Sequence, residues 1–454
     1  MKKLGLQITV HNIPEGRFMC PGFIDLHIHA PQYSYTGTAT DRPLMDWLDH
    51  YTFPREAQMQ DLKEAKAQYS QLVQRLISNG TTTAVMFGSL HLEPTMLLAD
   101  TLHQAGLRAY VGKVCMDRNS KDYYQHSLEQ NLADTEAFVR HVRSLKSTLV
   151  HPVVTPRFVP SCSPSLLQGL GRLAQEHDCH VQSHISESLD NDAFVHALHP
   201  EVNGRDARLY EQAGLLTQRT VMAHGVTLTT SELRLLADRG TAIAHCPLSN
   251  FYFADVPLDV QRCLKAGVKV GLGTDVAGGY SPSMLSAMRS AVITSKAVRM
   301  MHIDAARRAP ASCLSASAAG NDGSASSEPV PAAGSEHHEG SASSPALAHQ
   351  REHAAAQQQR SAVEEAAARG TLGYKEAFWL ATMGGAHALG LQDTVGSFRV
   401  GKEFDAIMVD TELREPFDVF STDSLLDRFE KFVNLGDDRN VRAVWIQGGL
   451  VIWK

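Results

Sequence analysis

Eight short apolar or β-branched runs recur along the first 280 residues, and helical patterns lie between most of them. Continuous apolar runs of this length are typical of strands that are buried on both faces of a parallel sheet. Eight such strands alternating with helices predict a TIM-type (β/α)8 barrel, whose active sites lie at the carboxyl ends of the strands. A doubly wound open sheet is the alternative, but no G-x-G-x-x-G turn follows any run. The runs are 23–29, 81–89, 108–116, 152–161, 180–187, 220–226, 241–250 and 269–279.

The composition changes after the eighth run and its following helix. Residues 303–369 are rich in Ala, Ser, Gly and Pro and contain few large apolar side chains. Such a segment cannot offset its ordering entropy by burial, so we expect a disordered surface insertion in which 351–369 could form a helix. The predicted organisation is 1–20 as a remnant of a small β-sandwich, 21–302 as the barrel, 303–369 as the insertion, 370–394 as a closing helix and 395–454 as sandwich strands.

Overall composition excludes several classes of protein. A chain of 454 residues with 43% hydrophobic residues can bury a large core, and its formal net charge of -7 argues against a nucleic-acid groove. Its seven cysteines are scattered and form no C-x-x-C pair, which indicates reduced thiols in a cytoplasmic protein. No apolar run is long enough to span a membrane, and the N-terminus has no secretion signal, so we expect no membrane partner.

Side chains able to bind a metal recur at the predicted strand ends. The first run ends in His27-Ile28-His29, and alternate residues of a strand point to the same side, so the two imidazoles project together. Each such residue alone is more often a packed histidine than a ligand, but their convergence at one barrel mouth favours a site. Imidazoles with a carboxylate suit Zn²⁺ or Fe²⁺. The other strand ends supply Arg157, His184, His224, His245 and Asp275.

Further polar residues near these ends suit catalysis and recognition of a flat ligand. Glu187 follows His184 by three residues and could carry protons, although it could equally cap the next helix. Arg157 next to Phe158 offers a bidentate donor beside an aromatic face, which suits a heterocycle with carbonyl oxygens. Gln32 offers both a donor and an acceptor.

The order of these residues resembles that of the amidohydrolase superfamily and, within it, of the guanine deaminases. The resemblance is carried over residues 21–300 and 374–440 by the stretches PGFIDLHIHAPQYSYTG, NGTTTAVMFGS, VGKVCMD, VTPRF, QSHISE, VMAHG, IAHCPLSN, GLGTDVAGGYS and GKEFDAI, with LGDDRN near the C-terminus.

The resemblance implies a role for each residue. One Zn²⁺ per chain, with Fe²⁺ as the alternative, would be bound by His27, His29, His184 and Asp275. A lysine at the fourth strand end, which holds a second metal in binuclear relatives, is absent here. The implied catalytic residues are Glu187 as proton shuttle, His224 as the base that steers the water and Asp275 as its proton acceptor. The implied substrate-binding residues are His29, Ala30, Pro31, Gln32, Arg157, Phe158, His184, Ile185, Ser186, Glu187 and Asp275, while His245 either lines the site or orients neighbours.

The implied activity is hydrolytic deamination of guanine to xanthine and ammonia, by a cytoplasmic homodimer of purine catabolism. Two alternatives stay open: another aminohydrolase or chlorohydrolase of a related heterocycle, and a non-catalytic scaffold. The zinc cytidine-deaminase class is excluded because no H-x-E followed by P-C-x-x-C occurs. The family usually has a longer N-terminal segment, so we also expect an incomplete sandwich with an exposed edge at 442–454.

Overall fold

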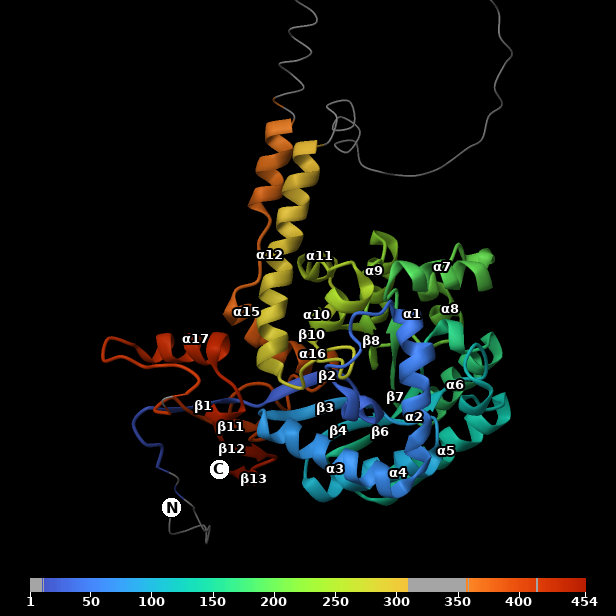
Figure 1. Ribbon diagram of the computed structural model, residues 1–454, viewed down its shortest axis with the longest axis horizontal. Coiled ribbons are helices and arrows are strands. Elements are labelled where there is room, and N and C mark those ends of the chain that lie inside the picture. The colour runs from blue at the N-terminus through green and yellow to red at the C-terminus, as the bar shows by residue number, and fades with distance from the viewer. Residues whose placement is uncertain (1–9, 11, 309–356, 358, 414) are drawn as a thin grey trace, which may run out of the picture. The chain divides into compact units, whose positions relative to one another are not determined.

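A parallel sheet with strand order β10-β9-β8-β7-β6-β4-β3-β2 forms the centre of the molecule (Figure 1). The computed structural model describes residues 10, 12–308, 357, 359–413 and 415–454. Two 2.8 Å backbone hydrogen bonds, from His29 N to Val276 O and from Asp275 N to His27 O, join the first strand to the segment after the last one. The predicted (β/α)8 barrel is thereby confirmed. Its strands are β2 Phe23–His29, β3 Thr81–Phe87, β4 Arg108–Gly112, β6 Val150–Pro156, β7 His180–Ile185, β8 Thr220–His224, β9 Ala242–His245 and β10 Lys269–Leu272, and the short β5 Val114–Cys115 pairs with β6.

Helices follow most of the barrel strands and cover their outer faces (Figure 1). Several begin at a side chain that accepts a backbone N–H, as Asp61, Ser127, Ser163 and Thr229 do, so the local sequence defines where they start. No helix in the described part of the chain is long and apolar enough to cross a membrane. The helices are α1 Leu44–Trp47, α2 Phe53–Ala57, α3 Leu62–Ser78, α4 Leu92–Ala105, α5 Leu128–Ser144, α6 Pro164–Glu176, α7 Leu189–Leu198, α8 Asp206–Gln212, α9 Thr230–Arg239, α10 Pro247–Ser249, α11 Val260–Lys265 and α12 Met284–Arg308.

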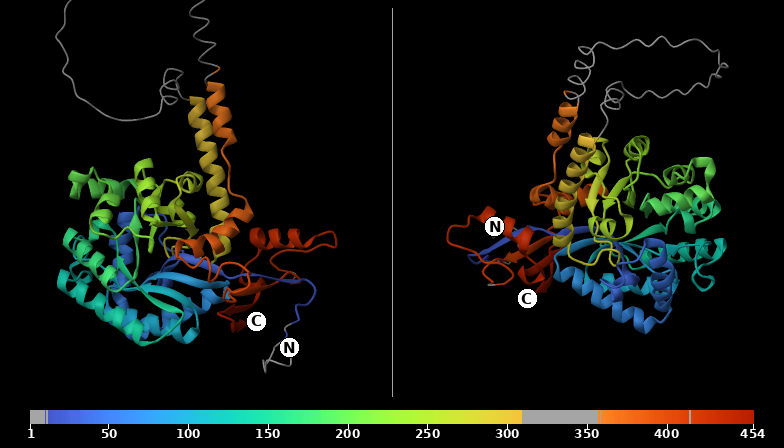
Figure 2. Two further views of the ribbon diagram at one scale, coloured as in Figure 1. Left: turned by 180° about the vertical axis from the view of Figure 1, so that it is seen from behind. Right: turned by 45° about the horizontal axis from the view of Figure 1, so that its top comes forward.

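A small antiparallel sheet is built from both ends of the chain, in the order β1-β11-β12-β13. Figure 2 shows its blue N-terminal strand beside the red C-terminal ones. Ile407 and Val444 on one face belong to the main core, whereas Met408 and Trp445 on the other form a separate small cluster. Within the described residues, β13 pairs only with β12, and its Trp453 is 53% exposed. The strands are β1 Arg17–Pro21, β11 Ala406–Asp410, β12 Val441–Ile446 and β13 Gly449–Trp453, and α17 Leu425–Leu435 lies between β11 and β12 in the sequence.

The segment predicted as a closing helix at 370–394 consists of α15 Tyr374–Trp379, a π-helical turn at Leu380–Gly384 and α16 Gly385–Ala388. Gly385 packs against the first barrel strand so closely that an added Cβ would lie 2.7 Å from the Cβ of Ile24. This close approach requires glycine and fixes the helix against the barrel.

Residues 296–371 form a second compact unit. The expectation that disorder begins at 303 is wrong for 303–308, because α12 continues to Arg308 and carries an Asp304–Arg308 ion pair of 3.0 Å at helical spacing. Residues 359–368 are also helical, and Gln359 donates a hydrogen bond to the carbonyl of Arg307. Residues 309–356, the greater part of the predicted insertion, lie outside those that the structure describes.

Candidate metal and substrate site

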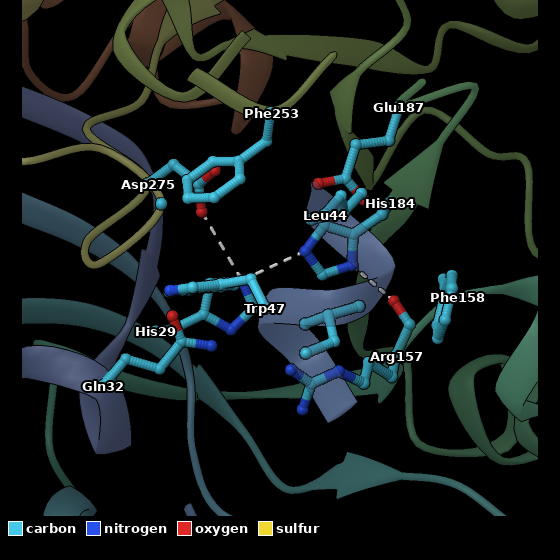
Figure 3. Close-up of a pocket in the computed structure, with 12 residues that line it drawn as sticks. His29, Gln32, Leu44, Trp47, Arg157, Phe158, His184, Glu187, Phe253 and Asp275 are labelled. Carbon is cyan, nitrogen blue, oxygen red and sulfur yellow. Dashed lines mark hydrogen bonds and ion pairs between the residues drawn. The ribbon is translucent and has the colours of Figure 1, made fainter. Parts of the chain in front are cut away.

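Five of the predicted side chains meet at the carboxyl ends of the barrel strands. Figure 3 shows three of them, His29, His184 and Asp275. His27 and His29 end β2, His184 and His224 lie on β7 and β8, and Asp275 follows β10. His29 Nε2 lies 3.0 Å from His184 Nε2 and 3.5 Å from Asp275 Oδ1. Asp275 Oδ1 also lies 3.1 Å from His27 Nε2, and its Oδ2 lies 3.7 Å from His224 Nε2. The strand-end geometry therefore brings the proposed ligands together.

These residues fit a divalent metal ion. Potential ligand atoms lie within 4.8 Å of one another in the groups His27/His29/Asp275 and His27/His184/His224. The buried Nε2 atom of His224 has no hydrogen-bond partner among the described residues, and that of His27 faces Asp275 Oδ1. Burial lowers the pKa of His27, His29 and His184, so their rings are neutral and offer lone pairs. A cation at their centre would satisfy these buried atoms.

Cys246 also lies near this cluster, in a group with His224 and Asp275. Burial raises the pKa of its thiol well above the ordinary value. A protonated thiol is a poor metal ligand, so the imidazoles and the carboxylate remain the better donor set.

Residues behind the cluster fix the orientation of its members. His184 Nδ1 lies 2.5 Å from the carbonyl oxygen of Arg157, and His224 Nδ1 lies 3.0 Å from Asn250 Oδ1. With Nδ1–H donating, each ring turns the lone pair of Nε2 toward the site. Asp25 accepts hydrogen bonds from the backbone N–H and the hydroxyl of Thr274, at 2.9 and 2.6 Å, and so holds the residue before Asp275.

Asp275 is buried and Glu187 is mostly buried, and the pKa values of the two carboxyl groups shift in opposite directions. Burial raises the pKa of Glu187, whose Oε1 lies 3.5 Å from His224 Nε2. Burial also acts to raise the pKa of Asp275, but His27 and the neighbouring imidazoles outweigh it and lower the pKa. The two pKa shifts are therefore opposite in direction, as a pair with separate acid and base roles requires.

A pocket opens beside the histidine cluster (Figure 3). Sequence reasoning missed its apolar wall, because apolar side chains and glycine carry no signal that separates a ligand site from the core. The missed lining residues are Leu44, Trp47, Leu48, Phe253 and Gly278, and the predicted ones that line the pocket are His29, Gln32, Arg157, Phe158, His184, Glu187 and Asp275.

Four predicted substrate-binding residues and His245 do not line this pocket. Ala30, Pro31 and Ile185 are buried next to lining residues. Ser186 turns to Asp206, which accepts its backbone N–H at 2.7 Å and its hydroxyl at 3.0 Å. His245 is fully buried, and neither ring nitrogen has a hydrogen-bond partner in the described chain. Burial lowers the pKa of His245 to about 3, so it is a neutral residue of the barrel interior.

The amidohydrolase family profile matches residues 18–317 and 302–451 of the sequence. Together with the barrel and its histidine cluster, this match shows that the chain belongs to the amidohydrolase family.

Similar proteins at 30% identity or more include guanine deaminases, which confirms the resemblance seen in the sequence motifs. The chain is 38% identical to guanine deaminase of Homo sapiens over 98% of its length and 85% of that protein. It is 37% identical to guanine deaminase of Dictyostelium discoideum over 96% of its length and 82% of that protein. A crystal structure of guanine deaminase from C. acetobutylicum with bound guanine superposes with a TM-score of 0.77 at 32% identity, covering 97% of this chain and 91% of that one.

Proposed function

We propose that the protein is a guanine deaminase, which converts guanine and water to xanthine and ammonia. The observation that carries this proposal is one pocket that holds a histidine–carboxylate cluster together with Arg157 and Gln32. The cluster suits hydrolysis at carbon, and the arginine and carboxamide suit the polar edge of a heterocycle. The guanine deaminases to which the chain is similar support the same substrate.

We propose His27, His29, His184 and Asp275 as the ligands of a single Zn²⁺, with Fe²⁺ as the alternative. The fourth barrel strand ends at Pro156 and leads into Arg157, so no lysine is present there to bridge a second ion. A bound Zn²⁺ would lower the pKa of a water molecule to about 7.

Three side chains would then manage protons. Asp275, whose pKa is lowered, accepts a proton from the attacking water, while His224 orients that water through Nε2. Glu187, whose pKa is raised, donates its proton to the ring nitrogen beside C2 as water adds at C2 and leaves a hydroxyl there. The Glu187 carboxylate then takes the proton of that hydroxyl and passes it to the exocyclic amino group, so the C2–N bond breaks and ammonia leaves. The proton held by Asp275 returns to Glu187 and restores both groups.

Arg157 and Gln32 would recognise the base, and the apolar wall would exclude water from it. Donors that bind the 6-oxo group of guanine would face the 6-amino group of adenine, which is itself a donor. These protein donors would remain unpaired, and adenine would therefore bind more weakly than guanine. Trp47 and Phe253 line the same pocket and supply apolar faces for a flat ring.

We further propose a cytoplasmic homodimer that acts in purine catabolism. The six cysteines in the described residues are all free thiols, which supports a reducing compartment. The homodimer and the pathway rest on the resemblance to guanine deaminases.

A substrate panel tests the proposal. We expect the zinc-loaded protein to form xanthine from guanine, and kcat/KM for adenine, cytosine, a pterin and an amino-triazine to be at least ~10³-fold lower. A higher kcat/KM for any of these compounds would favour another aminohydrolase. Bound metal without turnover of any compound would favour the non-catalytic alternative.

A further inference from the structure

Glu56 is a buried carboxylate that accepts four hydrogen bonds directly behind the substrate pocket. It lies on α2, is 1% exposed and does not line the pocket. Its Oε2 accepts from Arg157 Nη1 at 2.6 Å and from the Tyr124 hydroxyl at 2.8 Å. Its Oε1 accepts from Gln32 Nε2 at 2.7 Å and from Arg157 Nη2 at 3.1 Å. One carboxylate therefore binds both of the polar residues proposed to read the purine.

These contacts decide which groups Arg157 and Gln32 can offer to a ligand. The bidentate pair with Glu56 uses one N–H on each Nη atom and leaves a second N–H on each. Gln32 Oε1 accepts the Ala277 N–H at 3.1 Å while its Nε2 donates to Glu56, so its carboxamide cannot flip. Arg157 also lies over the Phe53 ring at 5.0 Å, which holds the guanidinium plane from its face.

The arrangement is better explained by positioning than by stability. A buried ion pair contributes little net stability, because the desolvation of two charges offsets their attraction. Here both partners are almost fully buried, and the arginine lines the pocket while the glutamate does not. A carboxylate that accepts only from its neighbours fixes them as donors, and fixed donors suit a ligand that presents an oxygen.

We infer that Glu56 is a positioning residue that orients Arg157 and Gln32 and thereby sets the preference for a 6-oxo over a 6-amino purine. The inference rests on the proposed function and names the residue that gives that function its selectivity. Glu56 does not contact the substrate and acts only through Arg157 and Gln32.

The test compares Glu56→Gln with wild type on guanine and on 2,6-diaminopurine, which both carry the amino group at C2 and differ at C6. Glutamine has the same shape, but its amide nitrogen cannot accept from Arg157, so the guanidinium loses a charged hydrogen bond. We expect KM for guanine to rise about 10- to 100-fold, with a smaller change in kcat. The ratio of kcat/KM for guanine to that for 2,6-diaminopurine should fall at least ~10-fold, and the metal content should be unchanged.

Asp405→Asn is the matched control, because Asp405 pairs with the buried Arg108 far from the pocket. It neutralises a buried arginine–carboxylate pair in the same way, so it should lower the melting temperature without changing KM or the selectivity ratio. Glu56→Asp, which keeps the charge, should recover part of the guanine preference. Unchanged KM and selectivity in Glu56→Gln, or the same changes in Asp405→Asn, would overturn the inference.

Equilibrium binding of xanthine separates this inference from the proposed function, because it requires no turnover. If the wild type binds xanthine but does not deaminate guanine, the proposed function fails, and a weaker affinity of Glu56→Gln for xanthine still supports the positioning role. Equal affinity of the two proteins for xanthine, or no xanthine binding by the wild type, contradicts the positioning role of Glu56.

Discussion

At the scale of single residues, the proposed chemistry depends on two carboxyl groups at one barrel mouth whose pKa values are shifted in opposite directions. Glu187 is mostly buried, and desolvation raises its pKa, whereas the imidazoles around Asp275 outweigh burial and lower its pKa. The difference gives the site an acid and a base at the same pH.

The substitution Glu187→Gln tests the proposed role of Glu187 as the catalytic acid. The amide keeps the shape of the side chain but cannot relay a proton, so we expect kcat for guanine to fall by at least ~10²-fold while the metal content stays unchanged. Steady-state kinetics and elemental analysis measure both quantities. The control is Glu201→Gln, an exposed glutamate paired with His199 at 3.0 Å, which should leave kcat unchanged. A near-normal rate for Glu187→Gln would remove it from the mechanism.

Asp206 should make the stability of the protein depend on pH. Burial raises its pKa to about 7, although hydrogen bonds from Ser186 oppose the shift. The folded protein therefore holds this proton more tightly than the unfolded chain, whose aspartate pKa is about 3.9. The contribution of Asp206 to stability is present below pH ~4 and is lost as pH rises to 7.

Asp206→Asn removes this titration, because an amide does not ionise. We expect the melting temperature of the variant, relative to wild type, to increase between pH 5 and pH 8. Thermal melts at the two pH values measure the difference. A difference that does not change with pH would show that Asp206 does not titrate in this window.

The sequence revealed those site residues whose chemistry is recognisable without knowledge of the fold. His27, His29 and His184 stand at the ends of apolar runs, and a barrel necessarily brings such ends together. Glu56 and Asn250 carry no such signal, since each acts on a residue more than 20 positions away. The three-dimensional path of the loops decides which polar side chain contacts which site residue, and the sequence does not reveal that path.

At the scale of elements, the barrel strands were predictable because burial on both faces leaves a continuous apolar run. All seven residues of both β2 and β3 are buried. Helix α5 has a weaker sequence signal, because polar residues form half of its buried stripe and reduce the apolar periodicity. The buried positions of α5 are Asn131, Asp134, Thr135, Phe138, Val139 and Val142.

The segment 309–356 should be dispensable for folding and catalysis. Its composition offers few side chains for a core, and the helices that flank it are joined by the hydrogen bond from Gln359 to Arg307. We expect replacement of 309–356 by a short Gly-Ser linker to leave kcat/KM and the melting temperature nearly unchanged. A loss of either on this replacement would show that the segment contributes to the folded enzyme.

At the scale of the whole molecule, a cluster of charges, of which Arg108 and Asp405 are buried, joins the barrel to the small sheet. Arg108, the first residue of β4, contacts both Glu403 and Asp405 just before β11. Arg108 begins its strand, so this junction lies at the end of the barrel opposite to the site, where residues contribute to stability and not to chemistry. The sequence could not predict the junction, because its partners are 297 positions apart.

Asp405→Asn should therefore destabilise the molecule without altering the site. Removing the charge leaves Arg108 buried with only Glu403 as counter-ion, so we expect a loss of about 3 kcal/mol in the free energy of unfolding. Urea unfolding measures the loss, and kinetics on the folded protein should show an unchanged KM. No loss of stability would mean that the two parts are held together by apolar packing alone.

The central claim is that one metal ion, held by the strand-end histidines and Asp275, is required for guanine deamination. The most direct test measures metal content and xanthine formation in the same preparations of wild type and His27→Ala. We predict one Zn²⁺ or Fe²⁺ per wild-type chain, loss of activity on chelation and recovery on adding Zn²⁺, and little metal or activity in His27→Ala. Full activity in metal-free protein, or two metal ions per active chain, would contradict it.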